Sequence, residues 1–289
     1  MDELPKEALF HYTDAGGLLG MIKSKSIWLS HINYQNDSKE FYHAVELIND
    51  LLKREYRGLD LWLSNADFNI EETVYTFSLS KKKDLLSQWR GYCPNGGYSI
   101  SFNKDQIETM MQTYNLSVYK CLYDMDSKIE LIKQEILGVT PEEYASSLEQ
   151  NDDNFDSMCK IDARWLARVP RQLKLLKRQI NKYAPIMKHE SFSEEEEFRL
   201  VTDRTYSRLV GGPRDEGLDP LPFPIEFRER NNKIVPYVAA VMAEGNPILI
   251  DEIVIGPNPD PELSKSACEL LLKGTKAWIS NSNIPYKNW

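Results

Sequence analysis

Three charged residues spaced two apart carry the chemistry that this sequence suggests most directly. Glu195, Glu197 and Arg199 lie in the segment Phe-Ser-Glu-Glu-Glu-Glu-Phe-Arg-Leu-Val, residues 192–201. In an extended strand these three positions share one face. Paired carboxylates can stabilise a developing positive charge or divide the acid and base roles of a reaction. The alternative is a solvated charged face, or the acidic first turn of a helix, with its own ion pair.

A second polar pair lies near the N-terminus. His11 and Thr13 share one face of a strand predicted over residues 8–13, whereas Tyr12 points to the other face. An imidazole and a hydroxyl on one strand face can hydrogen-bond a sugar diol. The alternative for this triplet is a half-buried histidine bonded to a backbone carbonyl.

Hydroxyl and aromatic side chains follow in the middle of the chain. Ser78 and Ser80 share a face of a strand predicted over residues 74–80. Trp89 and Tyr92 are three residues apart on a predicted short helix. These two rings could close one side of a cleft in which a flat heteroaromatic ring stacks, or they could belong to the core.

Basic residues form a stripe on a helix predicted after Pro170. An apolar stripe lies beside it, as in an amphipathic surface helix. The stripe predicts a docking surface for RNA, DNA or an acidic protein, or else a solvated helix face. Its members are Lys174, Lys177, Arg178 and Lys182.

A metal site is not expected. The segment at residues 34–40 is explained by helix capping, with Asn36 or Asp37 as the cap. Of the metal-ligating types near it, only Glu40 and His43 have helical ligand spacing. The four cysteines are scattered without a Cys-x-x-Cys pair, which argues against zinc and against a disulfide framework.

The elements that must position these residues do not alternate regularly between strand and helix. Strands are predicted before about residue 126 and after residue 195, and residues 126–187 are predicted to be helical. Strands near 234–240 and 248–255, a helix at 262–280 and an edge strand at 284–289 complete the chain. This pattern favours an α+β fold over a doubly wound parallel sheet. We expect a single domain over residues 1–289, with 126–187 as a helical insertion.

Composition excludes several classes of protein. A net charge of −9 over 289 residues argues against binding of nucleic acid or an anionic membrane by the whole surface. The first residues are polar and do not form a signal peptide, and no apolar run approaches the length of a membrane span. These features predict a cytoplasmic protein that does not associate with membranes.

The motifs of this chain, taken in order, resemble a widespread bacterial family of domains of unknown function. The resemblance extends over about residues 8 to 289. It rests on the succession His-Tyr-Thr, Asn-Asp-x-x-Glu, Phe-Ser, Trp-x-x-Tyr, Gly-x-x-Ile-x-Phe, Phe-x-x-Glu-x-Glu-x-Arg, Val-Pro-Tyr and Glu-Ile-x-Ile-Gly-Pro.

More remotely, the His-Tyr-Thr and Glu-x-Glu segments resemble the ADP-ribosyltransferase fold. This resemblance implies a split, mostly antiparallel β-sheet core with NAD as the substrate. It implies that His11, with Tyr12 and Thr13 beside it, holds the adenosine-side ribose. Ser78 and Ser80 would then shape the nicotinamide pocket, and Trp89 or Tyr92 would stack on the ring.

The same resemblance assigns the charged segment. Glu197 would be the catalytic glutamate and Glu195 the acceptor-side glutamate. Arg199 would steady Glu197 or contact the pyrophosphate. The register within Glu194–Glu197 stays open, because four glutamates follow one another.

The implied function is transfer of ADP-ribose from NAD to a macromolecule, protein or nucleic acid, by a bacterial toxin or anti-phage effector. The basic stripe would present the acceptor, and an antitoxin could be a partner. Two other classes remain open from the residues alone. One is a non-catalytic module that binds a nucleotide or nucleic acid, and the other is a metal-dependent hydrolase that uses Glu195 and Glu197.

Overall fold

One mixed β-sheet organises the described part of the chain. The structure is a computed structural model that describes residues 4–35, 38–55, 74–136, 178–202, 225–230, 232–242 and 246–286. Within these residues the ten-stranded sheet has the order β10-β9-β4-β1-β3-β2-β8-β7, and β6 pairs with both β3 and β5. Neighbouring strands are antiparallel, except β9 and β10, which are parallel. The predicted α+β class is confirmed.

The strands are short, and most alternate buried core residues with polar ones. Their bounds are β1 Phe10–Thr13, β2 Ser26–His31, β3 Tyr75–Ser80, β4 Tyr98–Phe102, β5 Leu116–Lys120, β6 Glu197–Thr202, β7 Ile225–Arg230, β8 Lys233–Val241, β9 Ile250–Ile255 and β10 Trp278–Asn281.

The helices begin at capping residues that their sequences supply. Asp14, Asn103 and Asp124 each accept a backbone N–H in the first turn of the following helix. The α-helices are α1 Ala15–Ser24, α2 Ser38–Glu55, α4 Leu86–Tyr92, α5 Lys104–Tyr114, α6 Met125–Leu131 and α9 Pro261–Leu271, and residues 178–183 are also helical. Shorter turns are η1 Ile32–Tyr34, η3 Ile132–Ile136, η6 Ala184–Ile186 and η7 Glu190–Glu195.

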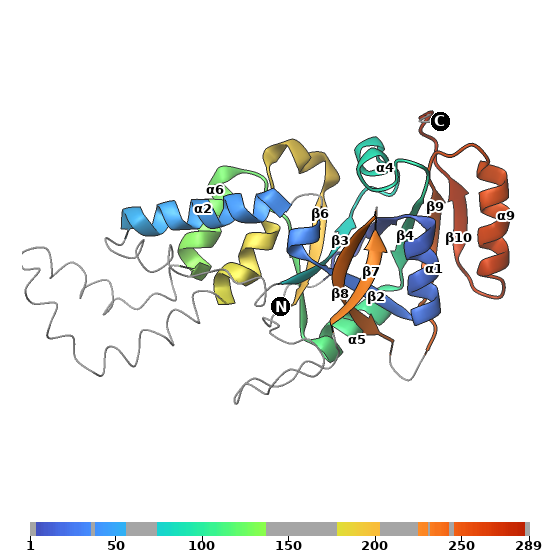
Figure 1. The fold of residues 1–289 in the computed structure, drawn as a ribbon, viewed down its shortest axis with the longest axis horizontal. Helices are drawn as coiled ribbons and strands as arrows, with labels where there is room; N and C mark the ends of the chain where they lie inside the picture. Colours follow the sequence, from blue (N-terminus) through green and yellow to red (C-terminus); the bar gives the residue numbers. More distant parts are fainter. Residues whose placement is uncertain are drawn as a thin grey trace, which may run out of the picture.

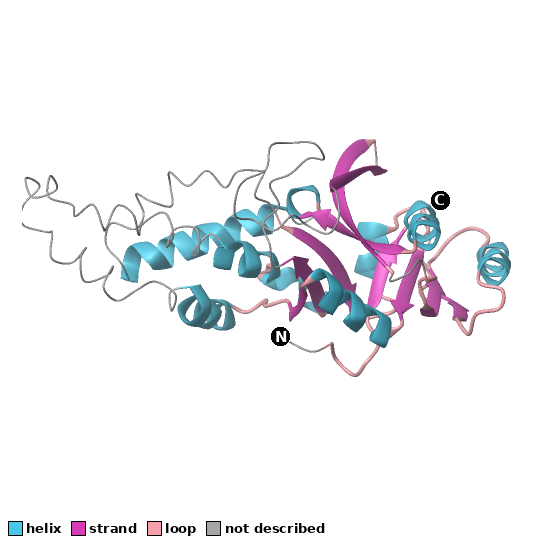
Figure 2. Ribbon diagram, turned by 90° about the horizontal axis from the view of Figure 1, so that it is seen from below, coloured by secondary structure: helices cyan, strands magenta, loops and turns pink. Residues whose placement is uncertain are grey.

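The helices lie mainly around the ends of the sheet. In Figure 1, α2 and α6 extend beyond one end of the sheet, whereas α9 lies beside β10 at the other end. The perpendicular view in Figure 2 shows that further helices lie beside the strands in the middle of the molecule. The described parts of the predicted helical insertion are α6, η3, residues 178–183 and η6, and much of the remainder lies outside the described residues.

Strands β1 and β2 share one edge of β3, and this arrangement creates the site. On its other edge, β3 pairs with β6 from Thr76 to Ser80. On the shared edge, β2 pairs with Tyr75 and Thr76, and β1 pairs only with Ser80. Strands β1 and β2 therefore diverge, and the sheet opens beside residues 77–79.

Strand alternation separates a core face from a polar face on both sides of this opening. Phe77 and Leu79 of β3 and Phe198 and Leu200 of β6 belong to the main hydrophobic core, which continues into β2, β4, β5 and β9. The opposite face of β3 carries Thr76, Ser78 and Ser80. Core packing on one face thus fixes which side chains the other face presents at the opening.

The structure corrects three predicted elements. The strand predicted over residues 195–202 begins only at Glu197. The helix predicted over 262–280 ends at Leu271, and the following residues turn back to form β10, whereas the edge strand was predicted at 284–289. Strand β7, Ile225–Arg230, lies where no strand was predicted.

Membrane insertion has no candidate segment in the described part of the chain. None of the helices there combines the length and the apolar character that a bilayer span requires.

Truncation of a buried β6 side chain should destabilise the fold. Leu200 has no exposed surface in the main core, and Leu200→Ala should lower the free energy of unfolding by about 2–5 kcal/mol because it leaves a cavity. Leu263 on α9 is 71% exposed, so Leu263→Ala should change that free energy by less than about 0.5 kcal/mol. Urea denaturation measures both, and equal effects would contradict this description of the core.

Candidate functional site

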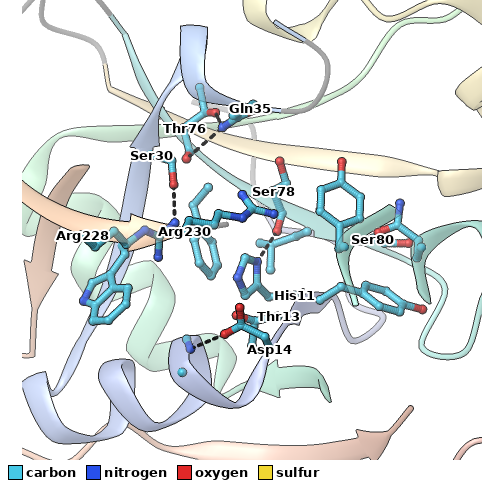
Figure 3. A pocket seen from close by; sticks show the side chains of 18 of the residues that line it. His11, Thr13, Asp14, Ser30, Gln35, Thr76, Ser78, Ser80, Arg228 and Arg230 are labelled. Carbon is cyan, nitrogen blue, oxygen red and sulfur yellow. Dashed lines mark hydrogen bonds between the residues drawn. The ribbon is translucent and has the colours of Figure 1, made fainter. Parts of the chain in front are cut away.

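A cavity of about 440 Å³ lies where the sheet opens. This volume is in the range of small-molecule binding sites, about 300–1,000 Å³. Its lining comes from β1, β2, β3, β6 and β7, from the first turn of α1 and from α4. Figure 3 shows these elements converging, with polar side chains pointing into the space between them.

Most of the predicted catalytic and NAD-binding residues line this cavity together. His11 and Glu197, which are far apart in the sequence, face the same space. The other predicted residues in the lining are Tyr12, Thr13, Ser78, Ser80 and Tyr92.

His11 is held in one tautomer by the backbone of β3. Its Nδ1 lies 2.9 Å from the carbonyl oxygen of Ser78, and its ring stacks on Phe77 with centroids 4.1 Å apart. A carbonyl oxygen only accepts, so Nδ1 carries the proton. The pKa of His11 is lowered to about 4, mainly by burial. The charges of Arg228 and Arg230 also lower this pKa, whereas the bond to Ser78 raises it. At neutral pH the ring is uncharged, and Nε2 can accept a hydrogen bond.

Glu197 is the first residue of β6, and its carboxylate is held by two cations. The ammonium of Lys188 lies 2.6 Å from Oε2, and Nε of Arg199 lies 2.8 Å from Oε1. The Glu197 N–H also donates to the hydroxyl of Tyr123 at 2.9 Å. The carboxylate is thus fixed in orientation at the edge of the cavity.

Glu195 does not share a strand face with Glu197, which corrects the prediction from strand periodicity. It is the last residue of η7, and Glu196 follows in a left-handed conformation with φ 42°. This turn breaks the alternation, yet Glu195 Oε2 still accepts from Lys188 at 2.6 Å. Ser80 Oγ donates to the Glu195 carbonyl oxygen at 2.6 Å and anchors the turn. The register among the glutamates is now fixed: Glu197 lines the cavity, and Glu195 is not part of the lining.

Lys188, Glu195, Glu197 and Arg199 form a buried charge network. Each is at most 5% exposed, and two positive charges offset two negative ones. Lys188 was missed in the sequence because nothing in its spacing marks it. It follows a short parallel bridge between Met187 and Leu122, which places it beside the start of β6. A cluster of three or more metal-ligating side chains does not occur among the described residues.

Two predicted binding residues are held in other roles. Arg199 does not line the cavity and donates to Glu197 and to the carbonyl oxygen of Pro185, so it supports the glutamate. Trp89 is 1% exposed, packs edge-on against Tyr12 and donates to Asp84 at 2.7 Å. The aromatic spacing of Trp89 and Tyr92 could not separate a core ring from a cleft ring.

The Tyr12 hydroxyl is occupied by the loop after β3. It donates to the carbonyl oxygen of Lys82 at 2.6 Å and accepts from the N–H of Leu85 at 3.1 Å. Tyr12 therefore connects β1 to the segment that leads into α4, and its contribution to the cavity wall is that of a fixed support.

Two arginines that the sequence analysis missed enter the cavity from β7. Arg228 and Arg230 are two residues apart and share a strand face (Figure 3). Arg228 donates to Ser30 Oγ at 2.7 Å, and its guanidinium lies 5.0 Å from the ring of Trp28. Burial lowers the pKa of Arg228 to about 10, and the neighbouring charge of Arg230 contributes to that shift. The alternating segment Ile-Glu-Phe-Arg-Glu-Arg was the signal that could have revealed this strand.

The basic stripe is only partly within the described residues. Arg178 is exposed, and Lys182 lies over the rings of Tyr183 and Tyr119 at 5.0 and 5.6 Å. Lys174 and Lys177 lie outside the described residues. A macromolecular docking surface on this helix stays a prediction.

Removal of the buried ammonium should destabilise the protein strongly. Lys188→Met leaves two buried carboxylates with only one cation, which should cost about 3–5 kcal/mol in the free energy of unfolding. Adding Glu195→Gln should recover part of that loss. The matched control is Lys83→Met, because Lys83 is 56% exposed and its pair with Glu252 is worth at most about 1 kcal/mol. Equal losses for Lys188→Met and Lys83→Met in urea denaturation would refute the buried network.

The lowered pKa of His11 should make stability depend on pH. The unfolded chain binds a proton near pH 6.5 and the folded chain only near pH 4, so stability is lost as pH falls between these values. His11 should account for about 2 kcal/mol of unfolding free energy lost from pH 8 to pH 5.

This pH dependence is measured by denaturation at both pH values. His11→Gln should show a smaller loss than the wild type. His43→Gln serves as control, because the side chain of His43 is 75% exposed, and should keep the wild-type loss. The same loss in all three proteins would contradict a buried, uncharged His11.

Comparison with known proteins concerns only part of the chain. No curated protein and no solved structure matches it. The resemblance to ADP-ribosyltransferases therefore stays a prediction. Residues 88–200 match the family described as "Protein of unknown function (DUF2971)". This segment contains the whole buried charge network but does not contain β1, β2 or β7. This match confirms, for that segment, the expected resemblance to a family of domains of unknown function.

Proposed function

We propose that this protein is an NAD-dependent ADP-ribosyltransferase that modifies a macromolecule, protein or nucleic acid. The observation that carries the proposal is that His11 and Glu197 line one cavity. Side chains in separate environments would have argued against it. The divergence of β1 from β3 supports the proposed likeness to the split sheet of that fold, although fold alone does not give function.

Glu197 would stabilise the transition state of nicotinamide release. Breaking the bond between nicotinamide and ribose develops positive charge on the ribose ring, as in glycoside hydrolysis. A carboxylate fixed beside the ring stabilises that charge without reorganising at the moment of reaction. Lys188 and Arg199 hold Glu197 in place, and its carboxylate would accept a hydrogen bond from the 2′-hydroxyl of the ribose when NAD is bound.

His11 would bind the other ribose of NAD. Its bond to the carbonyl oxygen of Ser78 leaves Nε2 unprotonated, and this atom can accept a hydrogen bond from a ribose hydroxyl. Thr13 lies on the same strand face and lines the same cavity. Ser78, Ser80 and Tyr92 would complete the wall on the nicotinamide side.

Glu195 takes a different role in this proposal from the one that the sequence suggested. It does not line the cavity, and its carboxylate accepts from Lys188. We assign it the positioning of Lys188, which in turn orients Glu197. The base that deprotonates the acceptor is then supplied by Glu197 or by the acceptor complex.

A non-catalytic nucleotide-binding module is the second candidate. The observation that favours it is the charge balance around Glu197, since a fully paired carboxylate can serve stability alone. The metal-dependent hydrolase gains less support, because the ammonium of Lys188 already occupies the position between the two carboxylates.

The biological setting is proposed by analogy. The protein would act in the cytoplasm of a bacterium as a toxin or anti-phage effector, with an antitoxin as a possible partner class. The basic stripe with Arg178 would contact the acceptor.

Release of nicotinamide from NAD tests the enzyme proposal. The wild type should release labelled nicotinamide, and Glu197→Gln should lower that rate by about 100-fold or more, because the carboxylate charge is removed. Glu196→Gln is the matched control, since the side chain of Glu196 is 41% exposed and pairs with Lys82. It should keep the wild-type rate.

The outcomes separate the candidates. Thermal unfolding must show that Glu197→Gln is folded. No release by the folded wild type, together with a thermal shift on addition of a nucleotide, would favour the binding module. Activity that needs no NAD and is abolished by a chelator would favour the hydrolase.

A further inference from the structure

We infer that Arg228 and Arg230 form a subsite for the diphosphate group of a nucleotide. The identification of this nucleotide as NAD rests on the proposed function. The subsite itself does not depend on whether Glu197 performs chemistry, because it concerns binding at a different wall of the cavity.

The first support is the pairing of like charges. Both guanidinium groups line one cavity from one strand face. Among the described residues, neither has a carboxylate within 4.0 Å. Both arginines are half-buried, and two neighbouring cations that are partly withdrawn from water repel one another unless an anion accompanies them. A ligand with negative charge would supply that anion.

The acids that line the cavity do not form ion pairs with these arginines among the described residues. Asp14 accepts from the N–H of Gly17 at 2.7 Å, and Glu229 accepts from the N–H of Asn232 at 2.6 Å. Glu197 is bonded to Lys188 and Arg199. Asp14 acts on the pKa of Arg228 from beyond ion-pair distance, and its effect is smaller than those of burial and of Arg230.

The second support is that Arg228 is held ready for a ligand. Its side chain donates to Ser30 Oγ and lies against the rings of Trp28 and Tyr237, at 5.0 and 5.6 Å. Its buried Nε has no hydrogen-bond acceptor among the described atoms. A guanidinium that these contacts already fix in position loses little conformational entropy when it binds a phosphate oxygen.

The chemistry of two guanidinium groups favours two linked phosphates over one. Each guanidinium can donate two parallel hydrogen bonds to phosphate oxygens. The cavity also places hydroxyl acceptors and donors of β1 and β3 within the same space, where a sugar attached to the diphosphate would lie. The expected ligand class is a nucleotide that carries a diphosphate, either internal, as in ADP-ribose, or terminal, as in ADP.

Calorimetric titration of the full chain tests the subsite without turnover. The probes are ADP-ribose, ADP, inorganic pyrophosphate and adenosine. The wild type should bind ADP-ribose, and Arg228→Gln and Arg230→Gln should each weaken that binding by about 10-fold or more, whereas adenosine should bind equally to all three. Arg90→Gln is the matched control, because the guanidinium of Arg90 also lies over a ring, that of Tyr286, but is not part of the cavity.

Each outcome of the titration supports or contradicts a part of this proposal. Tighter binding of ADP-ribose than of ADP identifies an internal diphosphate, and the reverse identifies a terminal one. Unchanged binding of ADP-ribose by the folded double variant, or no binding of any phosphorylated probe by the wild type, would overturn the subsite. Glu197→Gln should still bind ADP-ribose. If binding depends on both arginines but no nicotinamide is released, the subsite stands and the transferase proposal fails.

Discussion

The backbone of β3 is the constraint on which the site depends. Every buried carbonyl and N–H group needs a partner, and β3 cannot receive one from a strand where β1 and β2 have diverged. The carbonyl oxygen of Ser78 is satisfied instead by the ring of His11. One hydrogen bond thus fills a gap in the sheet, selects the tautomer of the histidine and fixes the ring at the cavity. Fold and site are coupled at this bond, so the opening and the orientation of His11 cannot change independently.

The opposite side of β3 is secured by charge rather than by backbone pairing alone. Glu197 pairs across the sheet with Ser80, whose hydroxyl anchors the turn that delivers Glu195. Lys188 binds both carboxylates, and so the start of β6 is held by ionic contacts in a place where water is excluded. Such a network is costly to assemble and costly to break. It holds a carboxylate in one orientation beside a cavity, whereas the side chain of a solvated glutamate would sample several rotamers.

Strand periodicity predicted several of the residues that β1 and β3 contribute to the cavity, because alternation is a local property of the backbone. It placed Ser78 with Ser80 and His11 with Thr13 correctly, and the α+β class followed from the order of elements. It failed for Glu195, since one left-handed residue, Glu196, changes the direction of every side chain before it. The sequence pattern does not show which residue in the run of four glutamates adopts this left-handed conformation.

The remaining site residues depend on contacts between distant segments. Lys188 joins the network through a bridge to Leu122, and Arg228 reaches the cavity because β7 pairs with β8, which pairs with β2. The spacing of residues in the sequence does not show which of these distant segments come into contact. The cavity is thus lined by three kinds of polar group: an uncharged imidazole, an oriented carboxylate and two guanidinium groups. A ligand that combines hydroxyl groups, a centre that becomes positive and adjacent phosphates would satisfy all three at once, and this is the reason for proposing a dinucleotide and not a simple anion or sugar.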